Sequence, residues 1–161
     1  MRLDGKIALV TGAGSGIGKC IAETYTREGA RVALADINAD AAKSAARTIG
    51  NNAIPLRCDV SKKADIDGVV EETLAAFGAL DILVNNAGAT HVNKPVLEIG
   101  EAEYDRIFAV NVKGFFSLVR RLSRRSGRKA GVSSSISDRP PACVRAPGSR
   151  PITPPKAPST F

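Results

Sequence analysis

The sequence predicts an α/β protein built on a doubly wound parallel sheet, of which this chain carries the first half. Apolar runs of strand length alternate with segments whose apolar residues recur at helical spacing. A glycine-rich turn follows the first run directly, and an aspartate ends the second. The alternation stops after about residue 122, so we expect residues 123–161 to form an unstructured or poorly structured tail.

Four apolar runs are the predicted strands, and they lie at residues 6–10, 31–36, 53–60 and 80–88. Continuous apolar runs are typical of parallel strands that are covered on both faces. Pro55 in the third run predicts a strand at the edge of the sheet, because proline cannot donate to a ladder. With right-handed crossovers, these runs predict about four parallel strands in the order 3-2-1-4.

The first three predicted helices each have a start or stop signal. Asn38 can cap the second helix and Ser61 the third. The first three helices end at glycines, which are Gly29, Gly50 and Gly78. A fourth helical pattern runs from residue 104 to residue 119.

The charge distribution divides the chain in the same way. Residues 1–113 hold 13 Lys and Arg against 15 Asp and Glu, whereas residues 114–161 hold ten against one. The net charge of +7 therefore belongs to the second part, which also holds seven of the nine prolines. Such a segment cannot bury enough apolar surface to offset its ordering entropy. We expect a partial nucleotide-binding domain at 1–122 and a disordered basic tail at 123–161.

The stretch "TGAGSGIG" at 11–18 follows a strand and opens a helix. Glycines there allow a tight turn and a close approach to a pyrophosphate, whose charge the helix N-terminus meets. Asp36 ends the next strand, where a carboxylate accepts from the hydroxyls of an adenosine ribose and repels a 2′-phosphate. The sequence therefore predicts NAD as the cofactor and disfavours NADP. The alternative is a glycine-rich turn beside a solvent-exposed aspartate.

Together with "DV" at 59–60, "NNAG" at 85–88 and the asparagine in "FAVNVKG", this turn resembles the short-chain dehydrogenase/reductase family. The resemblance covers residues 1 to about 117 and is greatest to members like 3-oxoacyl-carrier-protein reductases and sugar dehydrogenases. It implies a Rossmann-type fold and an NAD(P)-dependent oxidoreductase that oxidises alcohols or reduces ketones by hydride transfer.

The resemblance also implies roles for residues. The pyrophosphate would be wrapped by Gly12, Ser15, Gly16, Ile17 and Gly18. Asp36 would hold the adenosine ribose, and Asp59 and Val60 would flank the adenine. The residues beside the nicotinamide-side ribose would be Asn86, Ala87 and Gly88. Asn111 would be the catalytic asparagine, holding a water in a proton relay.

Each of these positions also has a structural reading. Asp59 can be an acid at a helix N-terminus, "NNAG" an ordinary turn after a strand, and Asn111 a polar residue at a helix kink. His91, the only histidine, is expected to be a solvated loop residue, and no metal site is expected.

The family's chemistry needs a tyrosine as general acid/base, with a lysine four positions later to lower its pKa from about 10, and a serine beside the substrate oxygen. Neither tyrosine of the chain, Tyr25 or Tyr104, has a lysine at that spacing. We therefore expect this chain to be truncated relative to the family and inactive.

Residues 138–161 suggest a frameshift as the reason. Written with GC-rich codons and read two bases on, they encode "PPAGVRPRPGLTSYNASKGAVNF", which contains the missing Tyr-x-x-x-Lys pair. The reading frame would change near residues 114–123.

Two other functions stay open. The chain can be a non-catalytic dinucleotide-binding fragment, or its tail can bind nucleic acid or membrane. We do not expect a nucleic-acid or membrane partner, since the basic run lacks interleaved aromatic residues and a helical face. Widely spaced cysteines and the lack of a signal peptide favour a cytoplasmic protein. The resemblance implies a small alcohol or ketone substrate and a homo-oligomer, whose usual interface helices this chain carries only in part.

Overall fold

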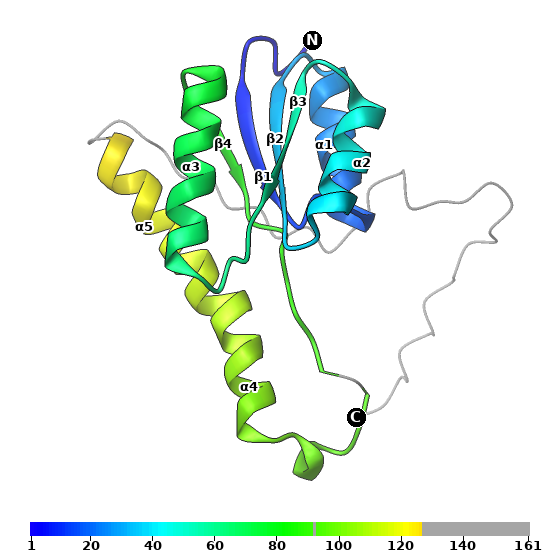
Figure 1. Ribbon diagram of the computed structural model, residues 1–161, viewed down its shortest axis with the longest axis vertical. Coiled ribbons are helices and arrows are strands. Elements are labelled where there is room, and N and C mark those ends of the chain that lie inside the picture. Colours follow the sequence, from blue (N-terminus) through cyan, green and yellow to red (C-terminus); the bar gives the residue numbers. More distant parts are fainter. Residues whose placement is uncertain (92, 127–161) are drawn as a thin grey trace, which may run out of the picture.

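The computed structural model describes residues 1–91 and 93–126, which form a parallel sheet between two layers of helices (Figure 1). The strands are β1 (Ile7–Thr11), β2 (Arg31–Asp36), β3 (Ala53–Arg57) and β4 (Ile82–Val84). All pairings are parallel and the order is β3-β2-β1-β4. The predicted fold class and strand order are therefore confirmed. Pro55 lies in β3, at the edge of the sheet, as predicted.

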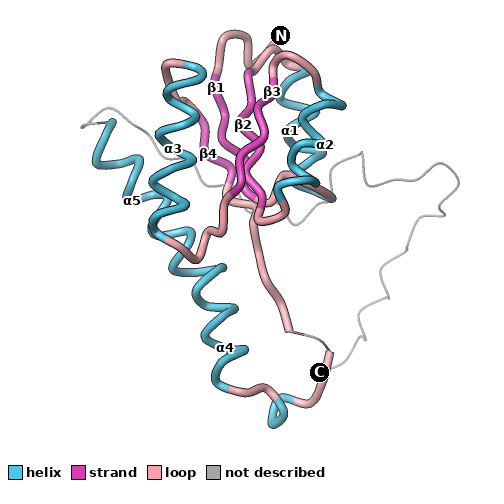
Figure 2. The backbone as a smooth tube through the Cα atoms, in the orientation of Figure 1, coloured by secondary structure: helices cyan, strands magenta, loops and turns pink. Residues whose placement is uncertain are grey.

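Helices cover both faces of this sheet (Figure 2). One face carries α1 (Gly16–Arg27) and α2 (Ala39–Ile49), and the other carries α3 (Lys63–Phe77) and α5 (Phe115–Ser126). Between β4 and α5 the chain forms η1 (Val96–Glu98), α4 (Glu101–Phe108) and η2 (Ala109–Gly114). Figure 1 shows α4, η2 and α5 as one continuous helical run that extends past the sheet. The segment η2 is π-helical.

The central strand β1 divides the core into two clusters. Leu9 packs toward α3 and α5, with Ile66 and Leu118. Its neighbours Ala8 and Val10 pack toward α1 and α2. All three strand residues are fully buried, because alternate side chains of a strand point to opposite faces and both faces are covered.

The helix caps follow the sequence prediction at one helix and depart from it at another. Asn38 caps α2 by accepting the Asp40 and Ala41 N–H groups, both at 3.1 Å. The prediction that Ser61 caps the third helix is wrong, since α3 begins at Lys63 and has no side-chain cap. The Ser61 hydroxyl is turned away from the helix and donates to the Asp59 carboxylate in the preceding turn, at 2.7 Å.

Two predicted strands are shorter than their apolar runs. The third ends at Arg57, and the fourth comprises only Ile82–Val84. After each strand the backbone turns at the C-terminal edge of the sheet. There the Asp65 side chain accepts the Asp59 N–H, and the Thr11 side chain accepts the Asn86 N–H, in place of a strand partner.

The expected boundary between residues 122 and 123 falls within α5 and stays a prediction. Residues 127–161 of the predicted tail lie outside the described residues. Within the described part of the chain, no helix is long and apolar enough to cross a membrane.

Candidate functional site

The glycine turn that follows β1 is packed against the segment that follows β4. Gly12 has a φ of +64°, in the left-handed region that favours glycine. A Cβ added at Gly12 would lie 2.9 Å from the Ala87 Cα, and one at Gly18 would lie 2.2 Å from the Gly12 carbonyl oxygen. Backbone therefore occupies the space that larger residues would need, and the turn closes tightly over the edge of the sheet.

Thr11 and Asn86 hold these two segments together. The buried Thr11 hydroxyl donates to the Val84 carbonyl at 3.2 Å and accepts the Asn86 and Ala87 N–H groups at 3.1 Å. The Asn86 Nδ2 donates to the Thr11 and Gly12 carbonyls, at 3.0 and 3.1 Å. Thr11 was not among the predicted site residues, although it is the first residue of the glycine motif. The Asn86 side chain faces the glycine turn.

The N-terminus of α1 opens directly from this turn. Ser15 occupies the cap position in an extended conformation, and its side chain makes no capping hydrogen bond. The first turn of the helix holds no acidic residue. No acidic side chain of the helix itself therefore offsets its first N–H groups and the positive end of its dipole, and an anion can be bound there. Ile17 in this turn is 48% exposed.

Asp36, at the end of β2, is bound to the glycine turn. Its Oδ2 accepts the Gly14 N–H at 2.8 Å, and its Oδ1 accepts the Asn38 N–H at 2.9 Å. A Cβ on Gly14 would lie 2.9 Å from this Oδ2 and 2.8 Å from the Ala41 Cβ. The carboxylate is thus held beside the glycine turn by backbone amides on two sides.

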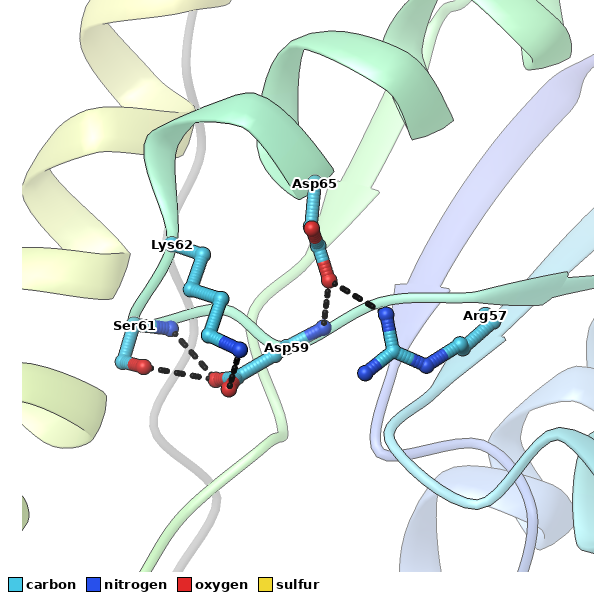
Figure 3. A network of polar contacts seen from close by, with 5 residues as sticks. All are labelled: Arg57, Asp59, Ser61, Lys62 and Asp65. Carbon is cyan, nitrogen blue, oxygen red and sulfur yellow. Dashed lines mark hydrogen bonds and ion pairs between the residues drawn. The ribbon is translucent and has the colours of Figure 1, made fainter.

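Asp59 lies in a network of polar contacts between β3 and α3 (Figure 3). Its Oδ1 accepts the Ser61 N–H at 3.0 Å and the Ser61 hydroxyl at 2.7 Å, and Lys62 Nζ lies 3.7 Å from its Oδ2. The hydroxyl bond from Ser61, above all, lowers the pKa of Asp59, and Lys62 adds to this effect. Asp59 is therefore ionised at neutral pH and can only accept hydrogen bonds.

Asn111 lies in the π-helical segment η2 and contacts the chain beyond β4. Its Oδ1 accepts the Ala89 N–H at 2.8 Å, and its Nδ2 donates to the Ala89 carbonyl at 2.9 Å. A Cβ on Gly88 would lie 3.6 Å from the Asn111 Oδ1. π-Helical turns are frequent at functional sites, and this one places the asparagine against the "NNAG" turn.

A small pocket of about 60 Å³ joins these parts, and it is lined by Thr11, Val60, Asn85, Ala87, Val110, Asn111, Phe115 and Leu118. Three predicted site residues, Val60, Ala87 and Asn111, therefore meet at one place. The glycine turn and Asp36 lie on the other side of Thr11, along the same edge of the sheet.

Cys58 directly follows β3 beneath this edge but does not line the pocket. Its side chain is buried, and burial is the main reason that its pKa is raised to about 12, with the nearby carboxylates of Asp65 and Asp59 adding to the effect. The thiol is protonated at any physiological pH, and it is a core residue.

The sheet order, the glycine turn at the helix N-terminus and the acid at the end of β2 define a Rossmann-type α/β domain. A family model described as short chain dehydrogenase matches residues 6–146, which extends beyond the resemblance seen up to about residue 117. The chain belongs to the short-chain dehydrogenase family, whose members are oxidoreductases.

Similar proteins include sugar-alcohol dehydrogenases. The chain is 45% identical over 150 residues to a sorbitol dehydrogenase of Cereibacter sphaeroides, covering 89% of this chain and 58% of that protein. It is 40% identical over 127 residues to a D-threitol dehydrogenase of Mycolicibacterium smegmatis, covering 77% and 48%. The chain therefore spans about half the length of these relatives.

Among solved structures, a 3-ketoacyl-(acyl-carrier-protein) reductase from Brucella melitensis complexed with NADH superposes with a TM-score of 0.75. It is 43% identical, and the match covers 76% of this chain and 50% of that one. The first sheet half and its flanking helices thus have a direct counterpart in a solved relative.

Proposed function

We propose that the described domain binds NAD, with the pyrophosphate at the N-terminus of α1 and the adenosine ribose at Asp36. The contact that carries the proposal is the bond from the Gly14 N–H to the Asp36 carboxylate, which holds an anionic acceptor beside the glycine turn. A ribose diol can donate to that carboxylate, whereas a 2′-phosphate would be repelled by it. NAD is therefore preferred to NADP.

The residues present fit such a group. The protein itself fills the space beside Gly12 and Gly18, whereas a Cβ on Gly16 would find nothing within 4 Å, so a pyrophosphate can approach the backbone at Gly16. The uncapped first turn of α1, with Ser15, Gly16 and Ile17, offers N–H donors to it. Relatives of known structure support the proposal, since the Brucella melitensis reductase is complexed with NADH.

The remaining predicted residues take roles at the two ends of the dinucleotide. Asp59 and Val60 flank the adenine, and Ala87 and Gly88 line the nicotinamide-side ribose by their backbone. Asn86 acts at the same place by fixing the glycine turn, because its amide is bound to Thr11 and Gly12. Asn111 positions the "NNAG" turn through Ala89, and we propose that it also holds a water in a proton relay.

The family reaction would be hydride transfer between a small alcohol or ketone and the nicotinamide, which supplies or accepts the hydride when bound. We propose that the chain of 161 residues binds the dinucleotide without this turnover. Tyr25 lies on α1 and Tyr104 on α4, and neither has a lysine four positions later to lower the pKa of its phenol. We attribute the missing Tyr-x-x-x-Lys pair to a shift of the reading frame near residues 114–123. Sequencing of the locus tests this: no single-base change that restores a long open frame would refute it.

Isothermal titration calorimetry on the full chain tests the binding proposal. We expect NAD to bind, NADP to bind at least about tenfold more weakly, and Asp36→Ala to lose at least about tenfold in NAD affinity. Asp40→Ala is the matched control, since this aspartate on the next helix is 95% exposed and should leave NAD affinity unchanged. Absence of NAD binding to the unmodified chain would overturn the proposal. Formation of NADH from NAD and sugar alcohols, followed at 340 nm, should be undetectable.

A further inference from the structure

The first turn of α3 contains an aspartate, Asp65, that the binding proposal does not use. We infer that Asp65 is a positioning residue that makes the site select adenine over other purines, acting through Asp59. The inference rests on the proposed function, and it adds the part of the ligand that this turn recognises.

Asp65 holds the backbone at Asp59 in place. One of its carboxylate oxygens, Oδ2, accepts the Asp59 N–H at 3.0 Å and the Arg57 Nη1 at 3.0 Å (Figure 3). The Asp65 side chain is only 20% exposed and lies in the first turn of α3. The Asp65 side chain, which is anchored on the helix, therefore fixes the backbone N–H of Asp59, six residues earlier in the chain.

The Asp59 carboxylate then has one orientation. Both donors of Ser61 are directed at its Oδ1, so this oxygen is occupied within the turn. Among the residues that the structure describes, the Lys62 ammonium is the one polar group found near the second oxygen, Oδ2, at 3.7 Å. The oxygen Oδ2 can thus accept a donor from a ligand.

The next residue supplies the complementary group. Val60 lines the pocket beside Asn111 and carries a backbone N–H that can only donate. Adenine has an amino donor next to the N1 acceptor on its Watson–Crick edge. An ionised Asp59 oxygen and the Val60 N–H match this pair. Hypoxanthine carries a carbonyl oxygen and an N1–H in the same places. The Asp59 oxygen would then face another acceptor, and the Val60 N–H would face another donor.

The hydrogen bond to Asp59 is the important contact of Asp65, and its ion pair with Arg57 is secondary. Arg57 is 56% exposed, and exposed ion pairs contribute little. An asparagine at position 65 keeps an oxygen acceptor for the Asp59 N–H, whereas an alanine removes it. Asparagine should therefore rescue what alanine loses.

The test compares NAD with nicotinamide hypoxanthine dinucleotide by calorimetry on the full chain. We expect the unmodified chain to prefer NAD by at least about tenfold. Asp65→Ala should reduce this preference to about twofold or less, mainly through weaker NAD binding, and Asp65→Asn should stay within about threefold of the original preference.

Asp67→Ala is the matched control. Asp67 lies on the same helix and also pairs with an arginine, Arg121, but on the side that faces α5. A general loss of α3 stability would affect both alanine variants, and thermal melting monitors this. Should Asp65→Ala fail to fold, Asp65→Glu keeps the charge and displaces the acceptor by one methylene, and it should lose at least half of the preference.

The outcomes separate the two proposals. A preference that survives in Asp65→Ala, or in Asp65→Glu where the alanine variant is unfolded, overturns the role of Asp65. An equal loss in Asp67→Ala does the same. If the unmodified chain binds both dinucleotides equally, the inference fails while NAD binding stands. If it binds neither, the proposed function fails and the inference falls with it.

Discussion

Replacement of Gly18 by alanine tests the packing of the glycine turn most directly. The added Cβ would lie 2.2 Å from the Gly12 carbonyl oxygen and 2.5 Å from the Asn86 Nδ2. Carbon and oxygen normally approach no closer than about 3.3 Å, so the turn must move by about 1 Å. Overpacking of this kind costs about 1–3 kcal/mol, and loss of an Asn86 hydrogen bond adds about 1 kcal/mol. We expect the free energy of unfolding to fall by about 2–4 kcal/mol.

The assay is urea unfolding of the full chain followed by circular dichroism, with NAD binding measured on the same samples. Gly68→Ala is the control, because Gly68 lies within α3 and its added Cβ would find no atom nearer than 4.0 Å. Alanine there should raise the free energy of unfolding by about 0.5–1 kcal/mol, through helix propensity. A Gly18→Ala chain within about 0.5 kcal/mol of the original stability would refute the packing argument.

Three further outcomes are expected. Asn111→Ala should lower the free energy of unfolding by about 1–2 kcal/mol, since it removes both bonds to the Ala89 backbone, and unchanged urea unfolding would contradict this. Ser61→Ala should raise the pKa of Asp59 toward its ordinary value, as followed by NMR titration. Because the folded pKa is lowered, the Asp59 contribution to stability is present above the unfolded pKa and is lost as pH falls through the folded pKa; the stability difference between the two chains should therefore vanish in acid. Cys58, with a pKa of about 12, should react with iodoacetamide at pH 8 at least about 100-fold more slowly in the folded chain than in urea, measured by mass spectrometry of its peptide.

Some local predictions succeeded because they depend on neighbours in the chain. Asn38 caps α2 by binding N–H groups two and three residues later. The glycine turn joins a strand and a helix whose apolar patterns can each be recognised in the adjacent sequence. Ser61 shows the limit of such reasoning. A serine before a helix is a good cap when its oxygen accepts a backbone N–H, but the Ser61 hydroxyl is turned toward Asp59 and donates to its carboxylate.

By itself, the sequence determined the strand order, the two covered faces of the sheet, the glycine turn and the acid at the end of β2. Apolar periodicity and glycine conformation are properties of short segments, so they can be recognised without the fold. Only the tertiary structure decided that the Asn86 amide faces the glycine turn and that Asn111 binds Ala89, 22 residues away. Such bonds join segments that are distant in the sequence, and their direction depends on how the strand ends meet in space. The same geometry made Asp65 a support for Asp59, which no motif marks.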